Sequence, residues 1–314
     1  MKPLVIVNPR SGGGRTGRTL PDLRKIIEAR LGEVDVVLTE RMGHASELAE
    51  RAAGEGREKL IAVGGDGTLS ECTDGVLRAG AGDAVVLGLV GQGTGGDFRK
   101  ALALEHRLET YLDAIAAGHE RRLDAGRARF LGHDGGERSR HFLNILSAGM
   151  GGLVDDHVSR ASRWLPGTAA YWFSSLRALL SIVPGRVRCT LHLAGAERTE
   201  MLTTYMIAIC NGRYFGSGMH VAPMAKIDDG IFEVVSMNAP GKIAFATRSQ
   251  SIYDGKHLGQ EGVTHLQCNR ITLEVENPEA KKTFLLDVDG EPLGAPPLDI
   301  EVLPRALRML APPL

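Results

Sequence analysis

Short apolar runs alternate with stretches of helical periodicity through the first part of the chain. Four runs rich in Val, Ile and Leu end in polar or glycine-rich loops: residues 2–7, 34–38, 59–63 and 85–90. Apolar residues recur at helical spacing between and after them, in residues 18–31, 46–53 and 69–79. This alternation predicts an α/β fold, with a parallel sheet that carries helices on both faces.

The pattern changes after about residue 124, where short apolar runs are separated mainly by turns. We expect strands at 142–146, 187–193, 203–210, 231–236, 263–266, 271–275, 283–286 and 298–303, with helices at 171–182 and 242–253. A mainly antiparallel second domain follows, as a β-sandwich or an open barrel. We therefore divide the chain into domains 1–125 and 126–314, with the last strand free to return to the first domain. We expect the active site to lie in the cleft between the two domains.

Composition narrows the class of protein. The 314 residues are 43% hydrophobic and 24% charged, with a net charge of -1, which supports a large core and predicts no basic face for nucleic acid. Four cysteines lack the paired spacing of zinc or redox sites. Residues 171–183 are too few to span a bilayer and contain Arg177, and no secretory leader is visible. A cytoplasmic location is expected.

The most informative stretch is residues 59–71, where an apolar strand enters Gly64-Gly65-Asp66-Gly67-Thr68 and a helical pattern starts. Glycines let a ligand approach the backbone, and the first amide groups of a helix bind phosphate. Thr68 is the expected N-cap of that helix. A carboxylate such as Asp66 beside phosphate requires Mg2+ or a donor group between them. The motif therefore predicts a nucleotide together with a metal ion.

Two further glycine loops follow the first and fourth strands. Both Gly12 to Gly17 and Gly91 to Gly96 have the glycine spacing of a dinucleotide-binding fingerprint. In the first loop, however, residues 8–11 separate the strand from the first glycine, where the fingerprint needs an immediate turn. An NAD-dependent oxidoreductase stays a distant alternative. Because all three loops follow parallel strands, they meet at one sheet edge, which favours phosphate binding.

The ordered set of motifs resembles the diacylglycerol kinase catalytic-domain family, which holds soluble bacterial lipid kinases related to sphingosine and ceramide kinases. The residues that carry this resemblance are Asn8-Pro9, Ser11-Gly12, Gly64-Gly65-Asp66-Gly67-Thr68 with Glu71, Gly93-Thr94-Gly95-Gly96-Asp97-Phe98, Asn211-Gly212, residues 222–230, and Asp287-Val288-Asp289-Gly290-Glu291-Pro292. They are distributed over nearly the whole chain.

The resemblance implies a first domain akin to phosphofructokinase and NAD kinase, followed by a β-sandwich. It implies ATP- and Mg2+-dependent phosphorylation of diacylglycerol or a related lipid alcohol, by an enzyme peripheral to the inner face of the membrane. By match to the family, the nucleotide-binding residues are Asn8, Ser11, Gly12, Thr39, Gly64, Gly65, Asp66, Gly67, Thr68, Leu69, Ser70, Gly93 and Thr94.

The resemblance also implies the catalytic and metal residues. Glu291 matches the proton acceptor, with Asp66 as the second catalytic residue. Asp229, with the backbone carbonyls of Lys226 and Ile231, matches a magnesium site. From the residues alone, Asp289 competes with Glu291 for the role of base, and the sequence Asp289-Gly290 also suits a simple hairpin turn.

Departures from the family pattern leave alternatives open. Gly96 and Ser70 stand where the family usually has asparagine, so another nucleotide donor or loss of activity is compatible with the sequence. The acceptor is open as well, and a sphingoid base or a non-lipid alcohol fits. A catalytically silent nucleotide-binding regulator is the alternative from another class. An exposed strand edge in the second domain would support a homodimer.

Overall fold

The computed structural model describes residues 1–93, 95–160, 167–216 and 218–313. Its first part contains four parallel strands in the order β4-β3-β1-β2. Their bounds are β1 (Leu4–Val7), β2 (Asp35–Leu38), β3 (Lys59–Gly64) and β4 (Val86–Gly91). These strands form because their residues are apolar on both faces and almost all of β1, β3 and β4 is buried. The predicted α/β class is confirmed.

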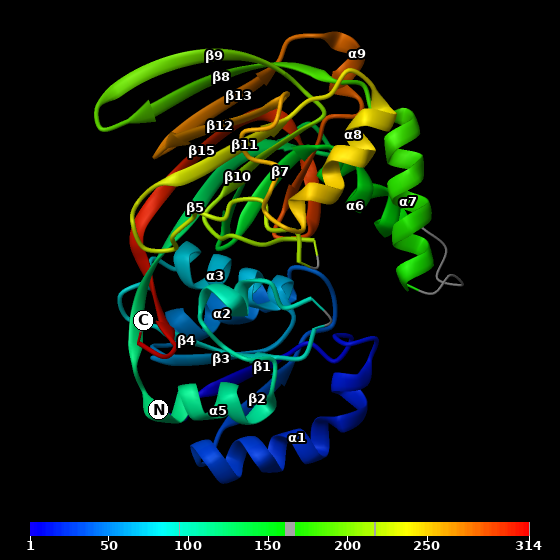
Figure 1. The fold of residues 1–314 in the computed structure, drawn as a ribbon. Coiled ribbons are helices and arrows are strands. Elements are labelled where there is room, and N and C mark those ends of the chain that lie inside the picture. Colours follow the sequence, from blue (N-terminus) through cyan, green and yellow to red (C-terminus); the bar gives the residue numbers. More distant parts are fainter. Residues whose placement is uncertain (94, 161–166, 217, 314) are drawn as a thin grey trace.

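Helices cover both faces of this sheet. They are α1 (Arg15–Leu31), α2 (His44–Gly54), α3 (Asp66–Arg78), α4 (Phe98–Ala101) and α5 (Leu108–Ala117). Figure 1 shows α1 and α5 on the outer face and α2 and α3 on the face toward the second half of the molecule. Gly75 lets α2 and α3 pack closely, because an added Cβ there would lie 2.1 Å from the carbonyl oxygen of Ser46.

The second half is built from two layers of mainly antiparallel strands, as the sequence predicted. One layer has the order β12-β11-β10-β7-β14, from β7 (Ile145–Gly149), β10 (Met206–Cys210), β11 (Phe232–Met237), β12 (Val263–Cys268) and β14 (Leu285–Val288). The other contains β5 (Glu120–Gly132), β6 (Glu137–Phe142), β8 (Gly185–Leu193), β9 (Ala196–Thr204), β13 (Arg270–Val275) and β15 (Glu291–Leu310). Phe142 and Phe232, from opposite layers, stack within their shared core.

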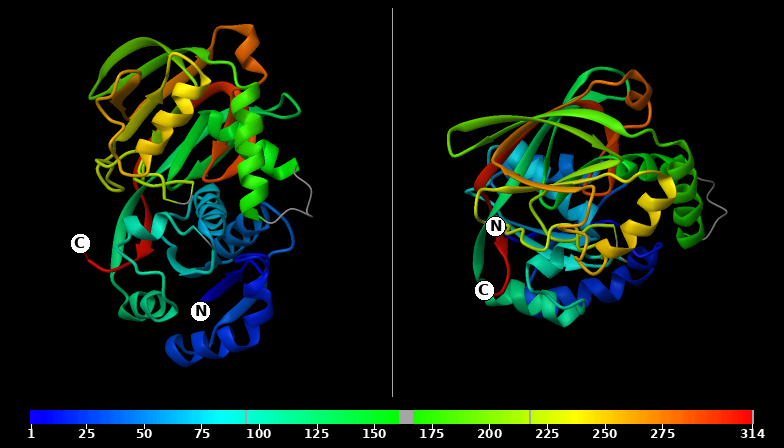
Figure 2. Two further views of the ribbon diagram at one scale, coloured as in Figure 1. Left: turned by 45° about the vertical axis from the view of Figure 1, so that its right-hand side comes forward. Right: turned by 45° about the horizontal axis from the view of Figure 1, so that its top comes forward.

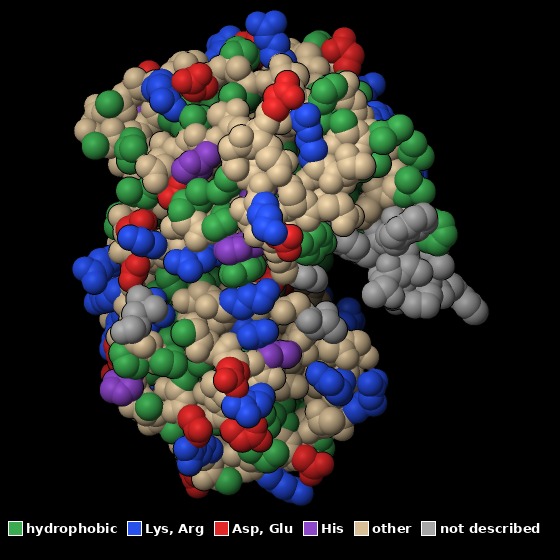
Figure 3. All heavy atoms as spheres, in the orientation of Figure 1, with side chains coloured by type: hydrophobic (Ala, Val, Ile, Leu, Met, Phe, Trp, Pro, Cys, Tyr) green, Lys and Arg blue, Asp and Glu red, His purple; other side chains and the backbone are tan. Residues whose placement is uncertain are grey.

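The remaining helices lie beside these layers. They are α6 (Met150–Arg160), α7 (Gly167–Ser181), α8 (Lys242–Ser249), the short 3-10 helix η1 (Gln250–Ile252) and α9 (Pro278–Lys281). Both views in Figure 2 place α7 and α8 next to each other at one side of the second half. None of the described helices is long and apolar enough to cross a bilayer. Positive and negative side chains are mixed over the face drawn in Figure 3.

Strand β15 joins the two halves. It pairs antiparallel with β14, β13 and β5, and its end then pairs parallel with β4 at Arg308 and Met309. Leu307 and Met309 are fully buried in the core of the first half. The proposed division at residue 125 therefore falls within β5, and the described strands form one continuous hydrogen-bonded sheet.

Some local predictions were wrong. Helix α3 begins at Asp66, with extended Gly65 as its N-cap, so Thr68 lies inside the helix and does not cap it. The single strand expected at 203–210 is the end of β9 followed by β10, with Tyr205 between them. Strands β5 and β6 were not expected, because their apolar residues are interrupted by arginines.

Candidate active site

A cavity of about 980 Å³ lies between the two halves of the molecule. Loops from the carboxyl ends of all four parallel strands line one part of it, at residues 8, 10–13, 39–42, 65–68, 71, 93 and 95–97. Strand β7, helices α6, α7 and α8, and the turn between β14 and β15 line the other part. The cavity therefore combines glycine loops from the first half with mixed polar and apolar walls from the second.

The glycine loops contact one another directly. An added Cβ at Gly93 would lie 2.7 Å from Cα of Gly65, and one at Gly12 would lie 2.8 Å from the carbonyl oxygen of Gln92. Gly12 also has a φ of +59°, which other residues rarely adopt. Asn8 Nδ2 donates to Thr68 Oγ1 across 3.3 Å, which links the first loop to α3. Backbone groups are thus brought close together, as phosphate binding requires.

Most of the predicted nucleotide-binding residues line this cavity. They are Asn8, Ser11, Gly12, Thr39, Gly65, Asp66, Gly67, Thr68 and Gly93. Gly64, Leu69 and Ser70 do not line it; the side chains of Leu69 and Ser70 are buried behind the loop. Thr94 lies outside the described residues. Leu69 and Ser70 do not reach the cavity because α3 already begins at Asp66, so these two positions face the core.

Asp66 is the first residue of α3 and lines the cavity. Its Oδ2 accepts a hydrogen bond from the backbone N–H of Asp97 across 2.6 Å. Burial raises the pKa of Asp66 to about 6, the Asp97 N–H lowers it, and the negative charges of Asp97 and Asp289 raise it. Several acids thus face one region of the cavity, which is the electrostatic environment that a cation relieves.

The turn between β14 and β15 carries the other acids. Asp289 and Gly290 both have positive φ, 50° and 88°, so these two residues form the tight hairpin that the sequence allowed. Asp289 accepts hydrogen bonds from the backbone N–H groups of Leu143, Asn144 and Ile145. This carboxylate therefore anchors the segment before β7, which distinguishes it from Glu291 as a candidate base.

Glu291 follows the turn, lines the cavity and is 8% exposed. Its Oε2 accepts from Arg140 Nη2 across 3.1 Å. Burial raises the pKa of Glu291 to about 8, Arg140 lowers it, and the neighbouring Glu71 and Asp289 raise it. Asp66 and Glu291, the two predicted catalytic acids, thus line one cavity.

Two residues at this site, Arg140 and Asp155, were not predicted from the sequence. Arg140 lies in a strand of polar residues, Glu-Arg-Ser-Arg-His-Phe, where nothing distinguishes it from Arg138. Asp155 of α6 and Asp287 of β14 form a hydrogen-bonded carboxyl pair lining the cavity. Burial raises the pKa of Asp155 to about 6 and raises that of Asp287 well above its ordinary value. Only contacts between distant segments identify Arg140 and Asp155, whereas Asp287 belongs to the motif that precedes Glu291.

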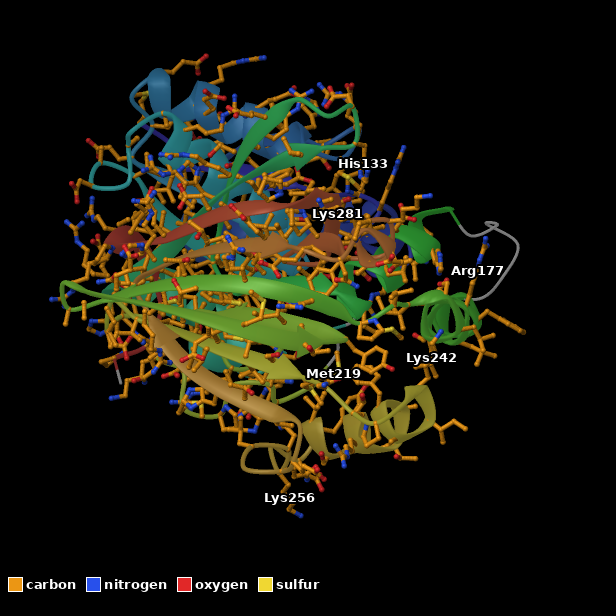
Figure 4. All side chains as sticks on the ribbon, turned by 90° about the horizontal axis from the view of Figure 1, so that it is seen from above. His133, Arg177, Met219, Lys242, Lys256 and Lys281 are labelled. Carbon is orange, nitrogen blue, oxygen red and sulfur yellow. The ribbon has the colours of Figure 1, made fainter. Side chains whose placement is uncertain are left out.

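The second part of the cavity is mainly apolar. Its walls include Met150, Val154, Leu176, Leu179, Met206, Phe215, Met219, Phe245, Ile252 and Tyr253. In Figure 4, Met219 lies between the sheet and α8, and Arg177 and Lys242 mark the side where α7 and α8 meet. Lys242 Nζ donates to the carbonyl oxygen of Leu180, which ties α8 to α7. An apolar substituent fits this part of the cavity.

The predicted metal residues lie away from the cavity walls, in the loop before β11. Asp229 Oδ1 accepts from the N–H of Ile231 across 3.1 Å. Burial raises the pKa of Asp229. The charge of Glu233 raises this pKa further, by more than the charge of Lys226 lowers it. No group of three His, Cys, Asp or Glu side chains suits a metal among the described residues. One carboxylate with backbone carbonyls is nevertheless an all-oxygen donor set that fits Mg2+.

Comparisons with known proteins agree with this architecture. Residues 2–128 match the family model of the diacylglycerol kinase catalytic domain, and residues 144–311 match that of the YegS C-terminal NAD kinase beta sandwich-like domain. Diacylglycerol kinases from Staphylococcus aureus strains bovine RF122 / ET3-1 and MRSA252 are each 27% identical over 308 residues, which cover 98% of this chain and 91% of theirs.

Solved structures show the same fold. A diacylglycerol kinase from Bacillus anthracis str. Sterne superposes with a TM-score of 0.69 at 22% identity, covering 99% of this chain and 97% of its own. A yeast NADH kinase complexed with NADH gives a TM-score of 0.50 at 11% identity, covering 100% of this chain and 84% of its own. At these identities the likeness concerns the fold.

Proposed function

This chain belongs to the family that joins a diacylglycerol kinase catalytic domain to a YegS C-terminal NAD kinase beta sandwich-like domain, and from this premise we propose that it is an ATP-dependent lipid kinase. Its acceptor is the hydroxyl of diacylglycerol or a related lipid alcohol. The single observation that supports this most is the cavity, in which glycine loops, two acids and an apolar wall occur together.

We assign the glycine loops to ATP, in particular Asn8, Ser11, Gly12, Gly65 and Gly93. Backbone N–H groups and the N-terminus of α3 suit the phosphates, since transfer of a γ-phosphoryl group depends chiefly on positioning and on charge stabilisation. Mg2+ would supply positive charge to the phosphate oxygens in the part of the cavity that Asp66 lines. Thr39 and Thr68 line the same part of the cavity.

We assign Glu291 the role of proton acceptor. The acceptor's O–H bond breaks, its proton passes to a Glu291 oxygen, and its oxygen bonds to the γ-phosphorus while the bond to the β–γ bridging oxygen breaks and ADP leaves. Asp229, with the carbonyls of Lys226 and Ile231, is proposed to hold a second cation that supports the loop before β11. The lipid chains are assigned to the apolar wall, with the protein at a membrane surface.

The test is transfer of labelled γ-phosphate from ATP with Mg2+ to a panel of lipid alcohols in mixed micelles. Label is expected in diacylglycerol or a related lipid, and Glu291→Gln is expected to reduce the rate by about 10²- to 10⁴-fold. Glu109→Gln, which changes an exposed carboxylate on α5, is the matched control and should keep full activity.

Other outcomes distinguish the alternatives. Label in a sphingoid base or a non-lipid alcohol alone would change the acceptor and keep the kinase chemistry. ATP binding without transfer to any acceptor would contradict the proposal and favour a nucleotide-binding regulator. Binding of NAD with reduction of a substrate would favour the oxidoreductase alternative.

A further inference from the structure

Arg140 connects the proposed base to a buried acid of the other half of the molecule. It lies on β6, and its side chain is 11% exposed, as is that of Glu291. Its Nη2 donates to Glu291 Oε2 across 3.1 Å, and its Nη1 lies 3.4 Å from Oδ2 of Asp74, on α3. Among the described residues, Arg140 is the one cationic side chain with an ion pair to Glu291.

Asp74 has other hydrogen bonds that do not involve Arg140. Its oxygens accept from Ser46 Oγ across 2.7 Å and from the backbone N–H of His141 across 2.9 Å. The ring nitrogen Nδ1 of His141 lies 3.1 Å from Asp74 Oδ1. Removal of the guanidinium therefore leaves Asp74 with polar partners, while it leaves Glu291 without its cation.

Two acids face Glu291 and raise its pKa. Glu71 of α3 hydrogen-bonds to it, and Asp289 lies two residues before it on the hairpin. Both oxygens of Glu71 accept backbone N–H groups at the start of α2, from Gly43 and Ala45, each across 2.9 Å. These bonds hold the Glu71 carboxylate in place beside Glu291, whose pKa it raises.

We propose, on the premise that Glu291 is the proton acceptor of a lipid kinase, that Arg140 is a positioning residue that increases the ionised fraction of Glu291 and orients it toward the acceptor hydroxyl. The guanidinium supplies the charge that offsets Glu71 and Asp289, and its hydrogen bond fixes one carboxylate oxygen. The other oxygen, Oε1, lies 3.8 Å from the point where a Cβ on Gly67 would stand, near the glycine loop of α3. Arg140 thus acts on the reaction through Glu291.

The test compares the pH dependence of kcat in wild type, Arg140→Met and Arg140→Lys between about pH 6 and pH 10. A carboxyl with a pKa of about 8 is about one-tenth ionised at pH 7, and loss of the nearby cation raises that pKa by about one unit or more. Arg140→Met should therefore lower kcat about tenfold at pH 7, with recovery at higher pH. Arg140→Lys should restore part of the wild-type profile.

The matched control is Arg138→Met, which removes an exposed arginine from the same strand and breaks only a surface pair with Asp134. Its pH profile should equal that of the wild type. A purely structural role for Arg140 would lower kcat by one factor at every pH, and that result would overturn the proposal. If Arg140→Met does not fold, Glu71→Gln tests the same cluster, because loss of the Glu71 charge should shift the pH profile of kcat to lower pH. An unchanged pH profile would again overturn the proposal.

A measurement without turnover separates this proposal from the proposed function. Glutamate labelled with ¹³C at its carboxyl carbon reports the titration of Glu291 by NMR, with Glu291→Gln identifying the signal. The midpoint should move to higher pH in Arg140→Met even where no lipid is phosphorylated. An unchanged midpoint would reject the role of Arg140, whereas absent phosphorylation with a shifted midpoint would reject the lipid kinase alone.

Discussion

Replacement of Glu291 by Gln is expected to stabilise the folded protein at alkaline pH, although it removes the proposed base. Glu291 is nearly buried, and burial, as the largest cause, raises its pKa to about 8 from an ordinary value of 4.5. Between these values the folded protein keeps a proton that the unfolded chain releases. The free energy of unfolding of the wild type therefore falls as pH rises through this window.

The magnitude follows from the difference between the two pKa values. The interval from 4.5 to 8 is 3.5 units, and each unit corresponds to about 1.4 kcal/mol, so the loss above pH 8 is at most about 5 kcal/mol. Gln carries no titrating proton, and its amide can accept from Arg140 and donate to Glu71, so the buried hydrogen bonds are kept.

The assay is urea unfolding followed by circular dichroism at about pH 5.5, 7 and 8.5, at constant ionic strength. The advantage of Glu291→Gln over wild type should grow with pH, and Glu109→Gln should follow the wild type throughout. A difference that is constant over this range, or that shrinks as pH rises, would refute the reasoning, because it would mean that Glu291 is ionised in the folded protein already at pH 5.5.

Two further predictions concern the glycine loops and the proposed cation. Gly93→Ala should weaken ATP binding about tenfold in calorimetry, because its Cβ would lie 2.7 Å from Gly65 Cα and force the loops apart. Gly241→Ala is the control, since no heavy atom lies within 4 Å of the Cβ it would add. Equal ATP affinities of the Gly93→Ala variant and the wild type would contradict the close-packing argument. Excess Mg2+ should raise the melting temperature of nucleotide-free wild type by about 3 °C and leave Asp229→Asn unchanged; an equal rise in the variant would place the ion elsewhere.

The sequence predicted those parts of the fold that depend on local patterns. Strands β1, β3 and β4 are apolar on both faces, and the glycines that follow them leave few other conformations, so the loop positions could be inferred. Strands β5 and β9 could not, since β9 is mostly exposed and rich in Glu, Arg and Thr. Such strands are stabilised by pairing with distant neighbours rather than by their own composition.

In the candidate site, too, only the residues within local sequence motifs could be predicted. Asp66 and Glu291 belong to short motifs and could be identified as candidate site residues. Arg140 could not, because its sequence context does not distinguish it from Arg129 and Arg138. Its role depends on the pairing of β6 with β5 and on the approach of α3, both set by tertiary structure. The start of α3 at Asp66 also depends on the extended conformation of Gly65, which Thr68 as a cap would not have predicted.

The return of β15 to the first half has a consequence for the order of folding during synthesis. Strand β4 has an open edge until Arg308 and Met309 pair with it, and these residues are made after all the other described strands. The first half is made before the second, yet its sheet stays incomplete until Met309 has been made, with an edge that can pair with other chains. A growing chain that stalls before residue 307 would thus be prone to aggregation, even though every glycine loop had already been made.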